Sequence, residues 1–122
     1  MIKGLGTDLV DVVRMEEKVL RPSFIKAAFT KLEIAYCHTK KHPAQHYGAR
    51  FAAKEAYMKA VGTGWGDHAE FKEIEVVRNT DGKPEISLSG NTLEYFNKLG
   101  YTQILVSLSH TKTTAMATVI IE

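Results

Sequence analysis

This sequence has very few of the residues and patterns that would indicate a disulfide scaffold, a zinc site or a membrane protein. Cys37 is the only cysteine, so no internal disulfide can form and no pair of cysteines has a zinc-type spacing. No apolar run approaches the length of a membrane span, and the N-terminus lacks the uninterrupted apolar stretch of a signal peptide. We therefore expect a soluble protein of the reducing cytoplasm, with no membrane partner.

Strong charge of either sign is also missing. The formal net charge is +2, and no run of like charges or low-complexity tract occurs. This balance gives no support to a nucleic-acid partner, and we expect none. With 44% hydrophobic and 25% charged residues in 122, the composition is typical of one globular domain. We expect that domain to span residues 1–122.

The first half of the chain has the patterns of one strand and several helices. An apolar strand is expected over residues 2–10, followed by a helix from Val12 towards Val19 that Asp11 caps. A short helix follows Pro22, and Thr30 with Glu33 forms a capping-box pattern for another, which ends near His38. The longest periodic segment predicts a main helix over residues 44–61.

The second half has mostly strand patterns. Strands around residues 74–77 and 85–88 are joined by the turn signal Asp81-Gly82. Asn91, with Glu94 three residues later, predicts a capped helix that stops at Gly100. Two further strands are expected over residues 104–108 and 115–121, with residues 109–114 between them. The fold class is α+β: a single compact domain with a mostly antiparallel sheet packed against one long and several short helices.

One face of the main helix has side chains suited to chemistry. Phe51, Glu55 and Lys59 are spaced four residues apart, so they lie along a single face. The glycines at 62 and 64 suit a helix stop whose backbone amides could approach an anion. An ordinary ion pair between Glu55 and Lys59 is an equally good interpretation of this helix taken alone.

Carboxylates and cations elsewhere suggest a site for a metal and a phosphate. Asp8 ends an apolar strand, and together with Glu55 it would supply the oxygen donors that Mg²⁺ prefers, although Mn²⁺ takes the same ligands. Lys54 and Lys59 would then provide positive charge for phosphates. Taken singly, Asp8 also fits a turn or cap residue.

Histidines are the other candidates for chemistry. His110 lies among hydroxyl side chains between two expected strands, where it could bind a phosphate or transfer a proton, although a solvated loop histidine has the same pattern. His38, His42 and His46 recur every four residues, but Pro43 interrupts a helix through them. We interpret these three as surface residues.

Three stretches, in order, closely resemble the 4′-phosphopantetheinyl transferases. They are Gly4-Leu5-Gly6-Thr7-Asp8, Phe51-Ala52-Ala53-Lys54-Glu55-Ala56-Tyr57-Met58-Lys59 and Ser107-Leu108-Ser109-His110-Thr111. The short length and the first stretch resemble the holo-[acyl-carrier-protein] synthase branch, and the resemblance runs from Ile2 to the C-terminus. Together the three motifs are much more specific than any one alone.

The resemblance implies transfer of 4′-phosphopantetheine from coenzyme A to a serine of an apo acyl carrier protein, releasing adenosine 3′,5′-bisphosphate. It implies that Asp8 and Glu55 hold Mg²⁺ against the pyrophosphate of coenzyme A, and that Lys59 neutralises charge as the phosphoanhydride breaks. Glu55, directly or through a metal-bound water, would help to deprotonate the serine, so the identity of the general base stays open. The coenzyme-binding set implied by the motifs and the glycine-rich stop is Lys54, Lys59, Gly62, Gly64, Ser109, His110 and Thr111.

The resemblance to the small members of this family implies a homotrimer with active sites at the subunit interfaces. The basic residues Arg14, Arg21 and Lys26 are expected to dock the acidic carrier protein, although relatives often have an arginine at the position of Ala27. The competing hypotheses are a non-catalytic coenzyme A-binding module of the same fold, and a helix face that forms only an ion-paired subunit interface. The carrier protein that is modified, whether of fatty acid or polyketide synthesis, is open.

Overall fold

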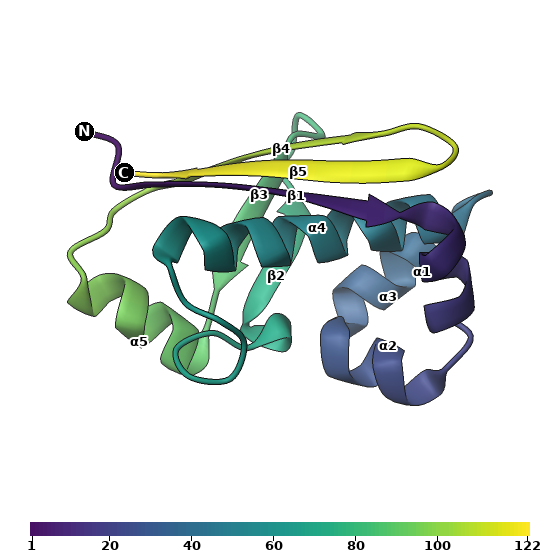
Figure 1. The fold of residues 1–122 in the computed structure, drawn as a ribbon, viewed down its shortest axis with the longest axis horizontal. Helices are drawn as coiled ribbons and strands as arrows, with labels where there is room; N and C mark the ends of the chain where they lie inside the picture. Colours follow the sequence, from purple (N-terminus) through teal and green to yellow (C-terminus); the bar gives the residue numbers. More distant parts are fainter.

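A three-stranded antiparallel sheet and one long helix form the centre of the molecule (Figure 1). The computed structural model describes residues 1–122. In the sheet, β5 (Thr114–Ile121) lies between β1 (Gly4–Asp11) and β4 (Ile104–His110), and α4 (Pro43–Val61) runs along one face. The remaining elements are α1 (Val12–Lys18), α2 (Pro22–Ala28), α3 (Lys31–His38), the 3₁₀ turn η1 (Phe71–Glu73), the antiparallel hairpin β2 (Ile74–Arg78) and β3 (Pro84–Leu88), and α5 (Gly90–Lys98). The predicted α+β class is confirmed.

Close packing of α4 on the sheet depends on small residues on both sides. Ala52, Ala53 and Ala56 are fully buried in the core. A Cβ on Gly4 would overlap the carbonyl oxygen of Ala60, and one on Gly6 would overlap that of Ala56. The glycines therefore allow β1 to lie directly against the helix backbone, which explains why the strand opens with Gly-Leu-Gly.

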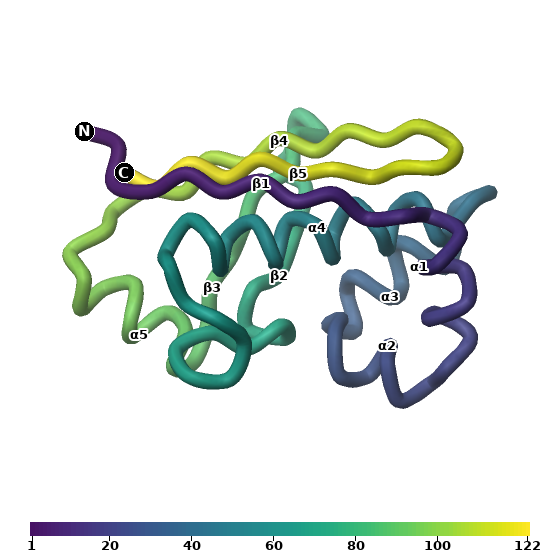
Figure 2. Tube along the Cα trace, in the orientation of Figure 1, coloured from purple at the N-terminus to yellow at the C-terminus, as the bar shows by residue number.

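The sheet has one covered and one open face. Along β5 the buried residues alternate with partly exposed ones, and the buried set, Ala115, Ala117, Val119 and Ile121, belongs to the core under the sheet. No helix covers the other face (Figure 1). Figure 2 shows β1 and β5 side by side along their whole length, with the two chain termini at the same end.

Two groups of elements pack beneath the sheet at opposite ends of α4. Helices α1, α2 and α3 enclose one apolar cluster, which includes Met15, Phe29, Cys37 and Tyr47. Burial raises the pKa of the Cys37 thiol to about 11, as suits a structural cysteine. At the other end the hairpin and α5 complete the larger cluster. No helix is both long and apolar enough to cross a membrane.

Most of the expected helix caps are present. The Asp11 side chain accepts from the backbone N–H of Val13, and Thr30 with Glu33 forms the capping box. The Asn91 cap is wrong: α5 begins at Gly90, after Ser89. The carboxylate of Glu73 instead accepts from the backbone N–H of Thr92 at 3.1 Å, so a distant side chain satisfies this helix end.

Candidate active site

Asp8 of β1 and Glu55 of α4 line one cleft of about 250 Å³. Asp8 pairs with the buried Ala117 in the sheet register, so its side chain lies on the helix-covered face. The close approach of β1 to α4 then brings it beside Glu55. The cleft is further lined by Leu9, Val10, Asp11, Arg14, Met15, Lys18 and Phe51.

Lys59 pairs with Asp8 and not with Glu55. Its ammonium donates to Asp8 Oδ1 at 2.9 Å and to the carbonyl oxygen of Thr7 at 3.1 Å. The interpretation of Glu55 and Lys59 as a simple ion pair within the helix is therefore wrong, since strand β1 supplies the partner of the lysine. Lys59 remains largely exposed at this position, with 55% of its side chain accessible.

The cleft disfavours the negative charge of Glu55. Burial and the nearby Asp8 raise the pKa of Glu55, and Lys59 and Lys18 only partly oppose this shift. Two carboxylates on one cleft fit Mg²⁺, which usually takes one or two protein carboxylates and completes its shell with water and phosphate oxygens. The structure has no group of three or more histidine, cysteine or acidic side chains that would form a closed metal cage. The donor set thus fits a cation shared with a phosphate ligand.

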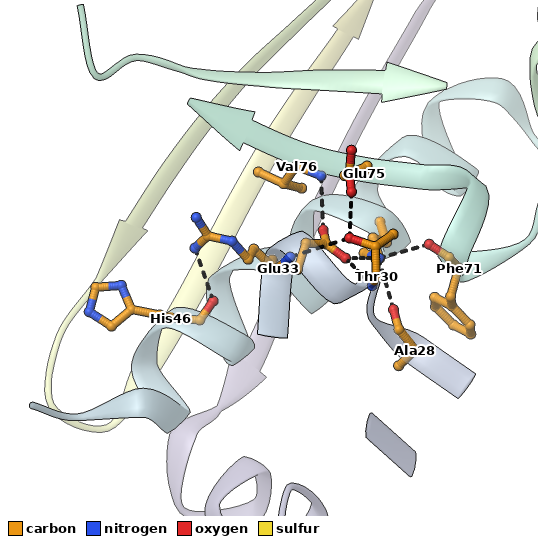
Figure 3. Close-up of polar contacts among 9 residues, drawn as sticks. Ala28, Thr30, Glu33, His46, Phe71, Glu75 and Val76 are labelled. Carbon is orange, nitrogen blue, oxygen red and sulfur yellow. Dashed lines mark hydrogen bonds and ion pairs between the residues drawn. The ribbon is translucent and has the colours of Figure 1, made fainter. Parts of the chain in front are cut away.

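Lys54 does not face this cleft, so its assignment as a phosphate-binding residue is wrong. The side chain is fully buried and pairs with Glu33 Oε1 at 2.7 Å. Its ammonium also donates to the carbonyl oxygens of Ala28 at 2.8 Å and Phe71 at 2.7 Å. Figure 3 shows these three acceptors converging from α2, α3 and η1. An ammonium has three N–H donors, and all are used.

The glycines after α4 end the helix but offer no free anion site at Gly62. Gly62 has φ 87°, and the N–H groups of Gly62 and Thr63 both donate to the carbonyl oxygen of Met58. The Gly62 amide is therefore used by the helix cap and is not free to donate to an anion, whereas its place in the coenzyme-binding set stays a prediction. Gly64 has open space around it, and neither glycine lines the cleft of Asp8 and Glu55.

His110 lies in a strand, which corrects its expected place between two strands. It is the last residue of β4, and its ring centroid lies 5.7 Å from that of His46 near the start of α4. Ser109, just before it, points to the opposite face of the sheet. Thr111 Oγ1 accepts from the backbone N–H groups of Thr113 and Thr114, so this hydroxyl shapes the turn between β4 and β5.

A second cleft with basic residues lies at this end of α4. It has a volume of about 570 Å³ and is lined by Val12, Glu16, Lys41, His42, Pro43, Ala44, Gln45 and Lys112. The turn that follows His110 contributes Lys112. The first cleft contacts the other half of α4 through Glu55, and no residue lines both clefts. His110 itself lines neither cleft.

A buried cation lies one helical turn beyond His46. Arg50 is 2% exposed, stacks on the Tyr36 ring at 4.1 Å, and has an Nε without a hydrogen-bond partner. No carboxylate pairs with it, because the ion pairs are those of Lys54 and Lys59. Burial, followed by Arg50 and His110, lowers the pKa of the neighbouring His46. Arg50 lines a separate cleft with Tyr36 and Arg78, and not the cleft of Lys41 and Lys112.

Sequence reasoning missed several of these cations. Lys18 follows Arg14 by four residues, so their shared helix face was a signal that could have been used. Lys112 follows His110 by two residues. No comparable spacing in the sequence indicated a role for Arg50 or Lys41. Arg14, Arg21 and Lys26, the expected docking residues, are all exposed on α1, α2 or the connection between them, and Arg14 lines the first cleft.

Comparison with known proteins is in line with this geometry. Residues 4–117 match the model of the 4′-phosphopantetheinyl transferase superfamily. A holo-[acyl-carrier-protein] synthase of Syntrophus aciditrophicus is 44% identical over 100% of this chain and 97% of its own length. The structure of the Neisseria meningitidis synthase superposes with a TM-score of 0.91 at 31% identity, covering 100% of this chain and 99% of that one. The Bacillus anthracis synthase, solved in complex with CoA (3′,5′-ADP), has a TM-score of 0.84 at 34% identity, covering 100% and 97%.

The fold, the motifs and these matches define the class: the chain belongs to the 4′-phosphopantetheinyl transferase superfamily. It is a transferase. Within the superfamily its relatives and structural neighbours are holo-[acyl-carrier-protein] synthases, and the chain falls in that branch. The resemblance that its three motifs indicated is confirmed.

Proposed function

We propose that this chain transfers 4′-phosphopantetheine from coenzyme A to a serine of an apo acyl carrier protein, with Mg²⁺ as cofactor and adenosine 3′,5′-bisphosphate as the released product. The serine oxygen forms a bond to the phosphorus that carries pantetheine, and the bond from that phosphorus to the bridging oxygen of the pyrophosphate breaks. The observation that carries the proposal is the pair Asp8 and Glu55 on one cleft, beside Lys59. We propose that residues 1–122 act as one transferase domain of the cytoplasm.

Asp8 and Glu55 would hold the Mg²⁺. Burial and the nearby Asp8 raise the pKa of Glu55, which supports this role because a cation would offset the negative charge that the cleft disfavours. When bound, the metal would supply positive charge to the pyrophosphate oxygens. Lys59 is exposed and only 2.9 Å from Asp8, so its ammonium can reach the same phosphates and stabilise the charge that develops on them. Glu55 lines the same cleft, where its carboxylate would help to accept the serine proton.

The second cleft would bind the adenosine half of coenzyme A. Lys41, His42 and Lys112 give it a basic wall, and His110 lies just before the turn that carries Lys112. We assign the phosphates of the adenosine half to this end of α4.

The separation of the two clefts supports a homotrimer whose active sites lie between subunits. His110 of one subunit would then complete the cleft of Asp8 and Glu55 in its neighbour. The open sheet face fits a subunit contact, since Leu5 and Leu9 are 64% and 67% exposed there and Met116 and Ile120 lie beside them. The carrier protein would approach the exposed basic residues Arg14, Arg21 and Lys26, next to the first cleft.

Mass spectrometry of an apo carrier protein tests the proposal. The purified chain, coenzyme A and Mg²⁺ should add the phosphopantetheine mass to the carrier, and a carrier whose acceptor serine is replaced by alanine should gain nothing. If the chain binds coenzyme A tightly in calorimetry but modifies no carrier, the non-catalytic binding module is correct. If neither Mg²⁺ nor coenzyme A raises the melting temperature, the helix face is only an interface.

A further inference from the structure

The buried pair of Lys54 and Glu33 joins almost every element around α4. Lys54 reaches Ala28 at the end of α2, Glu33 of α3 and Phe71 of η1. Glu33 Oε2 accepts from the backbone N–H of Val76 in β2 at 2.9 Å, while Oε1 also accepts from that of Thr30. Figure 3 shows these contacts as one network between helices and hairpin. The network therefore fixes α4 against four other elements.

The network lies on the opposite side of α4 from the sheet. At about 100° per residue, Lys54 points roughly away from Ala52 and Ala56, which pack on the sheet side. Glu55 and Lys59 lie on the flank between these two contacts. The helix is thus held from both sides by buried contacts.

On the basis of the proposed transferase function, we infer that Lys54 is a positioning residue, which with Glu33 fixes the rotation of α4 about its axis and hence the place of Glu55 and Lys59 in the cleft. A rotation of about 10° displaces an atom at the surface of a helix by about 1 Å, since the surface lies about 5–6 Å from the axis. A misplacement of that size can reduce catalysis by about 100-fold. A rotation of α4 by about 10° would therefore be enough to reduce turnover.

A purely structural role predicts a different result. Replacement of a buried ion pair by neutral side chains often has little effect on stability, whereas removal of one partner leaves an uncompensated charge. If the pair served stability alone, a neutral pair that folds would be fully active. If the pair positions α4, a neutral pair that folds would still lose turnover, because a methionine side chain in place of Lys54 has no N–H to donate to the three acceptors.

The test uses three variants. The first carries both Lys54→Met and Glu33→Gln, the second carries the milder change Glu33→Gln alone, and the third is the control Phe96→Leu. Phe96 is a buried residue of α5 that lines neither cleft, so its replacement lowers stability without touching the network. Each variant is assayed well below its melting temperature, with folding checked by circular dichroism. We expect kcat to fall by about 10- to 100-fold in the double variant, less in Glu33→Gln, and little in Phe96→Leu, with the KM for coenzyme A nearly unchanged.

A second readout is independent of transfer. The Phe51 ring, on the same flank as Glu55, stacks on Phe71 at 5.1 Å, so proton NOEs between these rings report the rotation of α4. They should weaken in the network variants and persist in Phe96→Leu. A folded network variant with wild-type kcat, or with lower kcat but unchanged NOEs, overturns the inference. If the double variant does not fold, Glu33→Gln decides by the same criteria. If the wild-type chain modifies no carrier, the proposed function fails, and the NOEs alone decide about positioning.

Discussion

Replacement of Gly6 by alanine should damage both stability and turnover, because it separates β1 from α4. The new Cβ would overlap the carbonyl oxygen of Ala56 and lie 2.7 Å from the nitrogen of Ala60, whereas ordinary contact needs at least 3.4 Å. Both obstacles are backbone atoms and cannot rotate away. Strand and helix must therefore move apart by about 1 Å, at a cost of about 1–3 kcal/mol.

The same displacement should affect the chemistry. Asp8 lies two residues beyond Gly6 on the strand that moves, and Glu55 lies on the helix that stays. A change of about 1 Å between them should lower kcat by up to about 100-fold. Thermal melts and the carrier-modification assay measure the two effects.

Gly48→Ala is the matched control, since this glycine lies in the same interface of α4 with the sheet. Its Cβ would meet only side-chain atoms, the nearest being Ala115 Cβ at 3.2 Å, and alanine in place of glycine favours the helix by about 1 kcal/mol. This variant should melt and react much like the wild type. If Gly6→Ala is as stable and active as wild type, or if Gly48→Ala does equal harm, close packing of β1 on α4 does not set the geometry of the site.

Three further predictions concern the charges of the site. Burial and Asp8 raise the pKa of Glu55, so the folded state favours the protonated carboxyl. The resulting contribution to the free energy of unfolding is fully present below the ordinary pKa of 4.5 and is lost as the pH rises through the raised pKa. Glu55→Gln should therefore melt above wild type at neutral pH without metal and lose this advantage in acid, while its activity is abolished; a lower melting temperature at neutral pH would contradict the sign. Mg²⁺ should raise the melting temperature of the wild type and not of Glu55→Gln, as measured by calorimetry, and an equal rise would exclude Glu55 as a ligand. Lys59→Ala should lower kcat by about 100- to 1,000-fold yet cost less than about 1 kcal/mol of stability, because its ion pair is exposed; full activity would remove Lys59 from the mechanism.

Local patterns in the sequence were sufficient for most of the fold. The capping box of Thr30 and Glu33, the cap at Asp11 and the helix stop at Gly62 depend on residues close in the chain, and all are present. The expected cap at Asn91 failed because Glu73, far along the chain, supplies the hydrogen bond. A motif that depends on tertiary contacts cannot be recognised from local spacing.

The site residues also divide into those that a local motif identifies and those whose place depends on tertiary contacts. The family motifs selected Asp8 and Glu55, which the fold brings to one cleft. They could not reveal that Lys54 points away from it, because the partners of that lysine come from three separate elements. Nor could they reveal Arg50 as a buried, unpaired cation, since burial is a property of the assembled fold.

The central claim is that this chain moves phosphopantetheine from coenzyme A to a carrier serine through the cleft of Asp8, Glu55 and Lys59. Mass spectrometry of an apo carrier protein, incubated with coenzyme A and Mg²⁺ and with either wild type or Glu55→Gln, tests it most directly. The wild type should convert the carrier to the phosphopantetheinylated form, and the variant should leave it unmodified. Conversion by both proteins, or by neither with any carrier, would contradict the claim.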